Sequence, residues 1–376
     1  MKKAVFIILI GVILYTYSNF NNCVFAQQTE EIPDSIAGLL DDGPYVYWQQ
    51  PTSAMVFYNC AGEIIIKEFE NTETVRFDGF CSDSNITYML PVQAPSIEPC
   101  IYKGVSEIFA ISDIHGEYDI FKDILLNSGV IDENLHWNWG NGHLVVVGDI
   151  FDRGAKVTEC LWLIYSLEQE ARQKGGRVHF LLGNHELMVL RGDLRYVHKK
   201  YIKGIARKRR ISYEDLYGPD MVLGRWLRTK PTVIKLNDIL FVHAGISPDI
   251  ISRNLSMEYI NEQVRNNIDA RSTKVAFDEE LKFLYKSNGP FWYRGYLEDE
   301  DYIRLTQIQV EEIQDYFDVS ALVIGHTGVD QVKSMYDRRV IAIDIPYESL
   351  FCFQALLYKN DTFYRVYGSG EVEKLH

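Results

Sequence analysis

Side chains that can bind metal ions follow several apolar runs in this sequence. The clearest case is the segment 148–154 (GDIFDRG), in which Asp149, Asp152 and Arg153 come directly after the apolar run 144–147. A buried carboxylate is costly unless it is paired or binds a metal ion. Asp149 is therefore expected to lie next to a cation, and the other apolar runs end in side chains that could help to bind it.

Five apolar runs end in residues of metal-ligand type. Each motif alone is a weak signal, because a histidine near a strand end is more often a hydrogen-bonded core or surface residue. Chance explains the whole set poorly, since the chain has only nine histidines and four of them follow these runs. The expected ligands are Asp113, His115, Asp149, Asn184, His243 and His326.

The ligand types indicate the metal and the reaction. Mixed oxygen and imidazole ligands suit manganese, iron, zinc or nickel better than soft copper(I). Six such ligands, with Asp149 as a bridging carboxylate, could hold two ions ~3.5–4 Å apart. Such a pair generates hydroxide and binds the oxygens of an in-line displacement at phosphorus. We expect two divalent metal ions as cofactors, with manganese as the expected metal and iron or zinc as alternatives.

The elements that position these side chains are expected to alternate between strand and helix. Short apolar runs bounded by polar residues or glycine indicate buried strands, and apolar positions at helical spacing indicate helices. In an open α/β sheet, sites form at the carboxyl ends of the strands. We predict strands at 108–111, 144–147, 177–182, 239–242, 321–324 and 340–343, helices at 119–128 and 157–174, and a largely helical segment at 187–230.

The region before these elements has a different pattern. Two runs typical of strands, 54–58 and 63–67, flank Ala61 and Gly62, which predicts a hairpin. We predict a small β-rich N-terminal unit over 43–100, followed by a catalytic domain over 101–376. The unit carries no set of catalytic side chains, so we expect a structural or partner-binding role for it.

The first residues predict a secretory signal peptide over 1–26. Lys2 and Lys3 form a basic start, the apolar run 4–15 follows, and the segment 24–26 (VFA) suits cleavage before Gln27. The alternative is a membrane anchor, but this run is shorter than the ~20 residues that a spanning helix needs. We therefore expect no membrane span and a periplasmic or secreted protein.

Composition excludes some functions and leaves others open. The 376 residues are 47% hydrophobic and 24% charged, which is typical of a globular protein. The net charge of -14 argues against a nucleic-acid-binding protein, which usually presents a basic face. Among the cysteines, Cys60, Cys81 and Cys100 lie in the N-terminal part, where either one disulfide or buried free thiols would fit.

A basic segment lies between the third and fourth predicted strands. Seven lysines and arginines occur within 199–210. We interpret this segment as a solvated helix face. The alternative is that its charge steers a phosphorylated or acidic substrate towards the site.

The motifs together resemble those of the calcineurin-like metallophosphoesterases, in the order and spacing of the phosphoprotein phosphatases. The segments PFWYRG (290–295) and RWLR (225–228) are similar to those of the bacterial, Shewanella-like phosphatase group. The resemblance covers about 105–346 and implies an α/β fold, a metallophosphoesterase-type β-sandwich flanked by helices. The motifs that carry it are SDIHG (112–116), GDIFDRG (148–154), GNHE (183–186), HAG (243–245) and GHT (325–327).

The resemblance implies a role for each matching residue. Asp113, His115 and Asp149 would bind the first metal ion. The second ion would be bound by Asp149, Asn184, His243 and His326.

The remaining matches imply the catalytic and phosphate-binding residues. His185 would protonate the leaving oxygen, and Asp152 would orient it, as carboxylates orient imidazoles in other acid–base pairs. Arg153 and Arg294 would bind the phosphate, since a guanidinium matches two phosphate oxygens. Asn184 would contact the phosphate as well as the metal.

These expectations describe an exported dinuclear-metal phosphatase that hydrolyses phosphomonoesters by attack of metal-bound hydroxide. Its substrate would be a phosphorylated protein, with phosphotyrosine as one candidate, or a small phosphoester. An alternative is a hydrolase of phosphodiesters or dinucleoside polyphosphates, because the same metal core serves those substrates. A catalytically silent binding protein of the same fold is a further alternative, but it would be expected to lack a ligand or the acid, whereas Asp149, Asn184 and His185 are all present.

Overall fold

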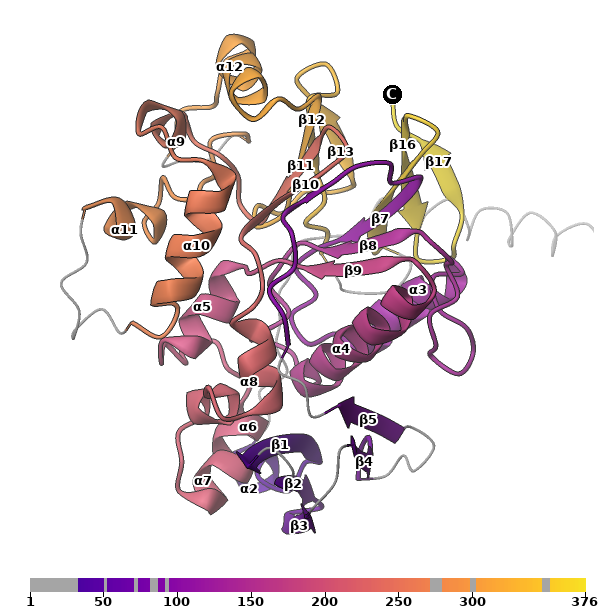
Figure 1. The fold of residues 1–376 in the computed structure, drawn as a ribbon, viewed down its shortest axis with the longest axis vertical. Helices are drawn as coiled ribbons and strands as arrows, with labels where there is room; N and C mark the ends of the chain where they lie inside the picture. Colours follow the sequence, from indigo (N-terminus) through magenta and orange to yellow (C-terminus); the bar gives the residue numbers. More distant parts are fainter. Residues whose placement is uncertain are drawn as a thin grey trace, which may run out of the picture.

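Two six-stranded sheets flanked by helices form the main part of the molecule (Figure 1). The structure is a computed structural model that describes residues 33–50, 53–70, 74–81, 87–91, 95–270, 279–297, 302–346 and 352–376. The predicted signal peptide, 1–26, lies outside the described residues. Within the described part of the chain, no helix is long and apolar enough to cross a bilayer.

The first sheet contains three of the predicted buried strands. Its order is β17-β16-β15-β7-β8-β9, in which β7, β8 and β9 are parallel and the rest pair antiparallel. The helices that follow β7 and β8, α3 (Tyr118–Asn127) and α4 (Val157–Gln173), lie together on one side of the sheet (Figure 1). The strands are β7 (Glu107–Ile111), β8 (His143–Val146), β9 (Arg177–Phe180), β15 (Gln354–Lys359), β16 (Thr362–Tyr367) and β17 (Val372–Lys374).

The second sheet contains the other three predicted strands, with the order β13-β14-β12-β11-β10-β6. The neighbours β11, β12 and β14 are parallel. Strand β10 is antiparallel to β11 and was not predicted. The strands are β6 (Ile101–Tyr102), β10 (Val233–Leu236), β11 (Ile239–Val242), β12 (Ala321–Ile324), β13 (Lys333–Met335) and β14 (Val340–Ala342). The helices between β11 and β12 are α9 (Pro248–Ser252), α10 (Met257–Asn267), α11 (Glu279–Leu284) and α12 (Gln307–Phe317).

The segment predicted to be largely helical, 187–230, is helical only in short pieces. Gly204 interrupts it with a non-helical conformation, and Arg210 ends one piece in the left-handed region at φ 56°. The prediction was therefore right about the kind of structure and wrong about its continuity. The pieces are α5 (Asn184–Leu190), α6 (Lys199–Tyr201), η1 (Ile202–Ala206), α7 (Arg207–Arg209), η2 (Glu214–Tyr217) and α8 (Val222–Leu227).

The N-terminal strands form two small antiparallel sheets at the end of the molecule nearest α6, α7 and α8 (Figure 1). The predicted hairpin is confirmed, because Ala61 and Gly62, both at positive φ, join β2 to β3. A disulfide joins Cys60 to Cys81, while Cys100 is a free thiol. The elements are α2 (Asp34–Ala37), β1 (Asp42–Gln50), β2 (Ser53–Cys60), β3 (Glu63–Phe69), β4 (Thr74–Asp78) and β5 (Thr87–Pro91).

The basic segment 199–210 packs against this N-terminal part at some positions, but five of its seven basic side chains are exposed, so the interpretation as a solvated face holds for most of the segment. Lys200 is 3% exposed, and its Nζ lies 3.5 Å from a carboxylate oxygen of Glu159. The Nζ of Lys208 donates to Asn59 Oδ1 at 2.8 Å and to the carbonyl of Gly62. A lysine placed in this way satisfies carbonyl and amide oxygens that would otherwise be unpaired. At these two positions the positive charge holds parts of the chain together.

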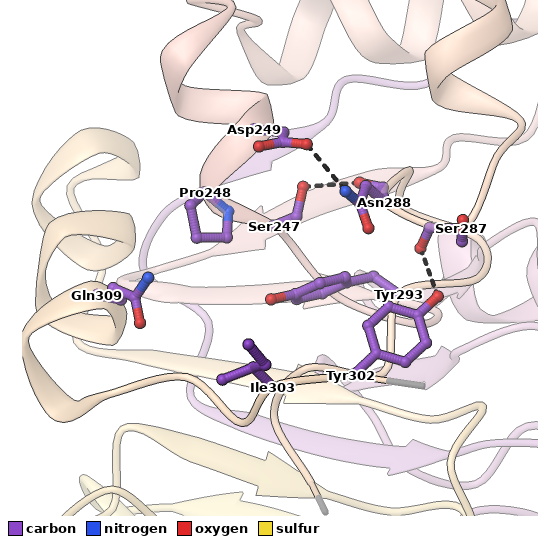
Figure 2. Close-up of a pocket in the computed structure, with 9 residues that line it drawn as sticks. All are labelled: Ser247, Pro248, Asp249, Ser287, Asn288, Tyr293, Tyr302, Ile303 and Gln309. Carbon is purple, nitrogen blue, oxygen red and sulfur yellow. Dashed lines mark hydrogen bonds between the residues drawn. The ribbon is translucent and has the colours of Figure 1, made fainter. Parts of the chain in front are cut away.

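A cavity of about 610 Å³ lies beside α9 and the segment that follows α11 (Figure 2). Figure 2 shows the amide of Asn288 donating to Asp249 at 2.9 Å and the hydroxyl of Tyr302 donating to the carbonyl of Ser287 at 3.0 Å. The ring of Tyr293 lies in the middle of this view. None of the 9 lining residues is basic, and none is a predicted metal ligand, so the cavity lacks the features of a phosphate site.

Candidate metal centre

The carboxyl ends of parallel strands from both sheets meet at one place. Asp113 follows β7 in the first sheet, and His326 follows β12 in the second. The backbone N–H of His326 donates to Asp113 Oδ2 at 3.0 Å, and Nδ1 of His243 donates to the carbonyl of Val147 at 2.8 Å. These bonds join the two sheets at their carboxyl edges. The predicted ligands from different strands are therefore brought together.

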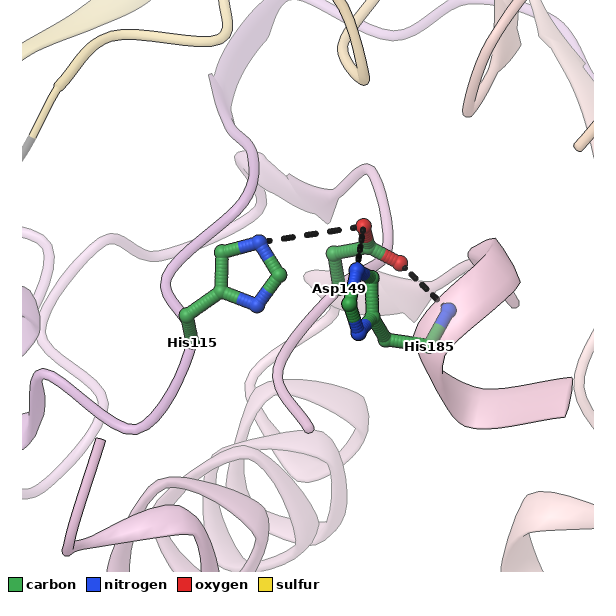
Figure 3. Close-up of side chains that lie close together, drawn as sticks. All are labelled: His115, Asp149 and His185. Carbon is green, nitrogen blue, oxygen red and sulfur yellow. Dashed lines mark hydrogen bonds and ion pairs between the residues drawn. The ribbon is translucent and has the colours of Figure 1, made fainter. Parts of the chain in front are cut away.

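Asp149 lies at the centre of this group and is 1% exposed. Its Oδ2 lies 3.3 Å from His243 Nε2, 3.8 Å from His115 Nε2 and 3.9 Å from His185 Nε2. Figure 3 shows two of these rings, His115 and His185, next to the carboxylate. Burial alone would raise the pKa of Asp149, but His243 and His185 beside it hold the pKa well below its usual range. Asp149 therefore stays ionised and attracts positive charge.

The surrounding side chains include two groups that could bind metal ions. Two groups of potential ligand atoms, each within 4.8 Å of one another, share Asp149: one adds His115 and His185, and the other adds His243 and His326. The Nε2 of His326 is buried and has no hydrogen-bond partner among the described residues. A buried nitrogen without a partner is costly unless it binds something. Asp149 is the residue that both groups share, and its role as a bridging ligand stays a prediction.

The other two predicted ligands also lie here, with different neighbours. Asn184 Oδ1 lies 2.9 Å from His243 Nε2. Asp113 Oδ2 accepts from Ser112 Oγ at 2.5 Å as well as from the backbone of His326. The group of potential ligand atoms that contains His115 and Asp149 is therefore completed by His185, not by Asp113. The assignment of Asp113 as a metal ligand and of His185 as the acid remains a prediction.

His185 forms a buried pair with Asp152, as the acid–base prediction requires. Its Nδ1 donates to Asp152 Oδ2 at 2.6 Å. Burial would lower the pKa of His185, but Asp149 and Asp152 raise it above its ordinary value. With Nδ1 occupied, only Nε2 is available to a substrate, and it lies on the side of Asp149. This geometry allows His185 to present a proton at the centre.

The two predicted phosphate-binding arginines approach the centre from different elements. Arg153 belongs to the turn after β8. The pKa of His115 is lowered by burial and also by nearby positive charge, including that of Arg153. Arg294 donates from Nη1 to Thr327 Oγ1 at 3.4 Å, directly after His326. Burial, followed by the charges of His243 and Arg294, lowers the pKa of His326. Both arginines thus place positive charge next to predicted metal ligands, and their phosphate-binding role stays a prediction.

Two other arginines of the matching segments have structural contacts. Arg228 donates from Nη1 to the carbonyls of Tyr217 and Gly224, both at 2.7 Å, and it pairs with Asp269. The guanidinium of Arg225 lies 5.8 Å from the ring centre of Trp48 in β1. These arginines therefore help to hold α8 in place.

Six residues at this site, none of them glycine, have left-handed backbone angles. Left-handed φ angles are uncommon for residues other than glycine, and such strain costs of order 1–3 kcal/mol and persists where surrounding contacts impose it. Here the N–H of Asp113 donates to Gly148 at 3.1 Å, and the N–H of His115 donates to Asp149 at 2.9 Å. The residues concerned are Asp113 (φ 54°), His115 (48°), Asp149 (56°), Asp152 (71°), Arg153 (63°) and His326 (64°).

Sequence analysis assigned no role to Glu186, which supports the central turn. Its buried carboxylate accepts backbone N–H groups of Gly183 at 2.7 Å, Asp149 at 2.9 Å and Ile150 at 2.7 Å. A Cβ on Gly183 would collide with the carboxylate of Asp149. The signal was present in the GNHE motif, where the glutamate at the third position of a helix can reach back to its N-terminus.

Asp344, which comes two residues after β14, was also missed. Burial, together with the nearby carboxylates of Asp113 and Asp149, raises the pKa of Asp344 well above its usual range. Its place at the carboxyl end of a predicted strand was the available signal. Burial and these carboxylates therefore favour the neutral form of Asp344.

Known proteins match both the sequence and the fold. The sequence model of the calcineurin-like phosphoesterase family matches residues 106–330. Shewanella-like protein phosphatase 1 of Plasmodium berghei (strain Anka) is 32% identical over 249 residues, which cover 64% of this chain and 67% of that protein. Shewanella-like protein phosphatase 2 of Arabidopsis thaliana is 25% identical over 287 residues, which cover 65% and 72%.

A solved structure extends the match to most of the chain. The cold-active protein-tyrosine phosphatase of a psychrophilic Shewanella species is 37% identical, with a TM-score of 0.81, and the match covers 90% of this chain and 100% of that one. This structural match extends beyond the part of the chain that contains the motifs. The chain therefore belongs to the calcineurin-like phosphoesterases, within the Shewanella-like protein phosphatase group, and is a metal-dependent phosphoric ester hydrolase.

Proposed function

We propose that this protein is a dinuclear-metal phosphomonoesterase that dephosphorylates proteins, with phosphotyrosine as its preferred side chain. The observation that carries the dinuclear centre is the position of Asp149, which belongs to both groups of potential ligand atoms. The support for phosphotyrosine is the 37% identity to a protein-tyrosine phosphatase over 90% of this chain. Manganese is the proposed metal, because the oxygen and imidazole ligands suit it.

The side chains of the site have distinct tasks in the proposed reaction. When bound, the metal ions supply a nucleophile by lowering the pKa of water, and they bind phosphate oxygens. Arg153 and Arg294 orient the phosphate, because a guanidinium matches two of its oxygens. His185 donates the proton that the leaving oxygen needs, and the bond from its Nδ1 to Asp152 at 2.6 Å keeps the ring in place.

A substrate panel tests this proposal. Purified protein loaded with manganese would be assayed on peptides of one sequence that carry phosphotyrosine, phosphoserine or phosphothreonine, and on a phosphodiester and a dinucleoside tetraphosphate. We expect the highest kcat/KM on the phosphotyrosine peptide. An Asp149→Ala variant serves as the control for contaminating phosphatases. A higher kcat/KM on the diester or the dinucleotide would reject the monoesterase assignment in favour of the alternative named above.

We also propose that the protein is exported. The basic start, the apolar run 4–15 and the segment 24–26 support a cleaved signal peptide. The disulfide between Cys60 and Cys81 supports an oxidising compartment such as the periplasm or the extracellular space. Mass spectrometry of the native protein should find a mature chain that begins near Gln27. An intact N-terminus at Met1 would contradict the proposal.

A further inference from the structure

Tyr196 is an exposed aromatic residue beside the proposed proton donor. Its ring centre lies 5.5 Å from that of His185, and the two planes are tilted by 54°. The side chain of Tyr196 is 50% exposed, whereas His185 and Asp152 are both buried. Tyr196 therefore presents an aromatic surface to solvent beside the buried His185.

The contacts of Tyr196 fix its position relative to the phosphate-binding turn. Its carbonyl accepts the backbone N–H of Arg153 at 2.8 Å. The guanidinium of Arg195 lies 5.5 Å from the centre of its ring, and this arginine is held in turn by Asp193 through bonds of 2.8 and 2.7 Å. A movement of Tyr196 would therefore disturb the turn that carries Arg153. The ring is held in place while half of its surface remains available.

The chemistry of the site places the leaving group on this side. A proton donor must come within ~2.6–3.2 Å of the oxygen that it protonates. Because Nδ1 of His185 is bonded to Asp152, the leaving oxygen must approach Nε2. The organic group attached to that oxygen then lies next to the His185 ring. Tyr196, with its ring 5.5 Å from that of His185, is within reach of this group.

We infer that Tyr196 forms one wall of a subsite for an aryl leaving group, so that aryl phosphates such as phosphotyrosine are selected over alkyl phosphates such as phosphoserine. Aromatic rings attract one another in offset or edge-to-face arrangements with centres ~4.5–7 Å apart. A phosphotyrosine ring can make this contact, and a serine side chain cannot. The inference rests on the proposed monoesterase function and assigns a residue to its substrate preference.

Two variants of Tyr196 distinguish the effect of its aromatic ring from the effect of its size. Tyr196→Leu keeps an apolar side chain without a ring, and Tyr196→Phe keeps the ring without the hydroxyl. The measurement is the ratio of kcat/KM on the phosphotyrosine peptide to that on the phosphoserine peptide. We expect Tyr196→Leu to lower this ratio by about 3- to 10-fold, which corresponds to the loss of one ring–ring contact. Tyr196→Phe is expected to keep the ratio of the wild type.

A second measurement does not depend on turnover. Benzylphosphonate and methylphosphonate are not hydrolysed, and they differ in the presence of an aromatic ring. Calorimetry of the manganese-loaded protein should show that Tyr196→Leu weakens the binding of benzylphosphonate by about 3- to 10-fold and leaves methylphosphonate unchanged. Thermal unfolding of each variant verifies that it is folded, and Tyr196→Phe provides the matched reference if the leucine variant is unstable.

The outcomes for Tyr196 and for the proposed function are distinguishable. Wild-type protein that does not hydrolyse either peptide would reject the proposed function, while the two phosphonates would still test Tyr196. Equal losses by Tyr196→Leu on both peptides would show that Tyr196 acts only by supporting Arg153 or His185, and would overturn the inference. An unchanged ratio together with unchanged benzylphosphonate binding would also overturn it.

Discussion

Replacement of His185 tests the proposed chemistry most directly. Its Nδ1 is bonded to Asp152 at 2.6 Å, and its Nε2 lies 3.9 Å from Asp149 Oδ2, so a single nitrogen is available for proton donation. A positioned proton donor contributes ~10²–10⁴-fold to the rate. We therefore expect His185→Ala to lower kcat on an alkyl phosphate by roughly 10²–10⁴-fold.

Asp152→Asn is expected to cause a smaller loss of the same kind. The variant keeps the size of the side chain but removes the charge that orients and polarises the imidazole. A hydrogen bond to a charged group contributes ~1.5–3 kcal/mol, which corresponds to roughly a 10- to 100-fold loss in rate. His185→Ala is expected to be more severe than Asp152→Asn, because His185 acts on the leaving group directly and Asp152 acts only through His185.

The assay compares leaving groups that differ in their need for a proton. 4-Nitrophenyl phosphate leaves as a stable anion, whereas phosphoserine requires protonation of its alkoxide. His185→Ala should therefore lose far more activity on phosphoserine, in single-turnover experiments that isolate the chemical step. His136→Ala is a matched control, because this exposed histidine also pairs with a carboxylate, that of Glu170 at 2.8 Å, and neither residue is assigned to the site.

Two results would refute the assignment of His185 as the acid. Equal losses on both substrates, with the chemical step limiting, would mean that no proton transfer from His185 occurs in the transition state. Loss of metal from His185→Ala would place the residue among the ligands instead. The second result is a real alternative, because His185 belongs to the same group of ligand atoms as His115 and Asp149.

Three further predictions concern the metal, the disulfide and pH. His326→Ala should lower the metal content from about two ions to about one per chain, since Nε2 has no other partner in the described structure; elemental analysis that still finds about two would contradict this. Cys81→Ser should lower the free energy of unfolding by about 3 kcal/mol, because the bond closes a loop of 21 residues; an unchanged denaturation midpoint would contradict it. Burial lowers the pKa of His143 to about 4 and that of its partner His179 well below its usual range, so the unfolded chain binds more protons than the folded chain as the pH falls below ~6.5. The free energy of unfolding should therefore fall as the pH is lowered from ~6.5 to about 4. In His179→Leu, the denaturation midpoint should depend less steeply on pH than in the wild type. Parallel curves for the variant and the wild type would be inconsistent with this account.

The main strands and the candidate site were predictable because their signals are local. A strand buried on both faces requires a continuous apolar run, and β11 and β12 have the predicted bounds 239–242 and 321–324. The residues that follow such runs lie at the carboxyl edge of the sheet. Asp149 and His243 could therefore be assigned to one site without knowledge of the fold.

Other features were not predictable, because their causes are distant in the chain. Strand β10 (Val233–Leu236) has Lys235 within its apolar run, and its pairing with β11 defines it. Lys208 occurs in a segment that is typical of a solvated helix, yet it bonds Asn59, 149 residues away. Propensity and charge pattern contain no information about such a partner.

The sequence by itself determined which kinds of side chain stand at the strand ends, and therefore that a metal-dependent reaction at phosphorus was the chemistry to expect. Only the tertiary structure decided that the two sheets meet with their carboxyl edges together, where Asp113 accepts from His326, 213 residues further along the chain. It also placed Tyr196 beside His185. The physical reason is that ligand type is a property of single residues, whereas the distances between ligands arise from the packing of two sheets whose strands are far apart in the sequence.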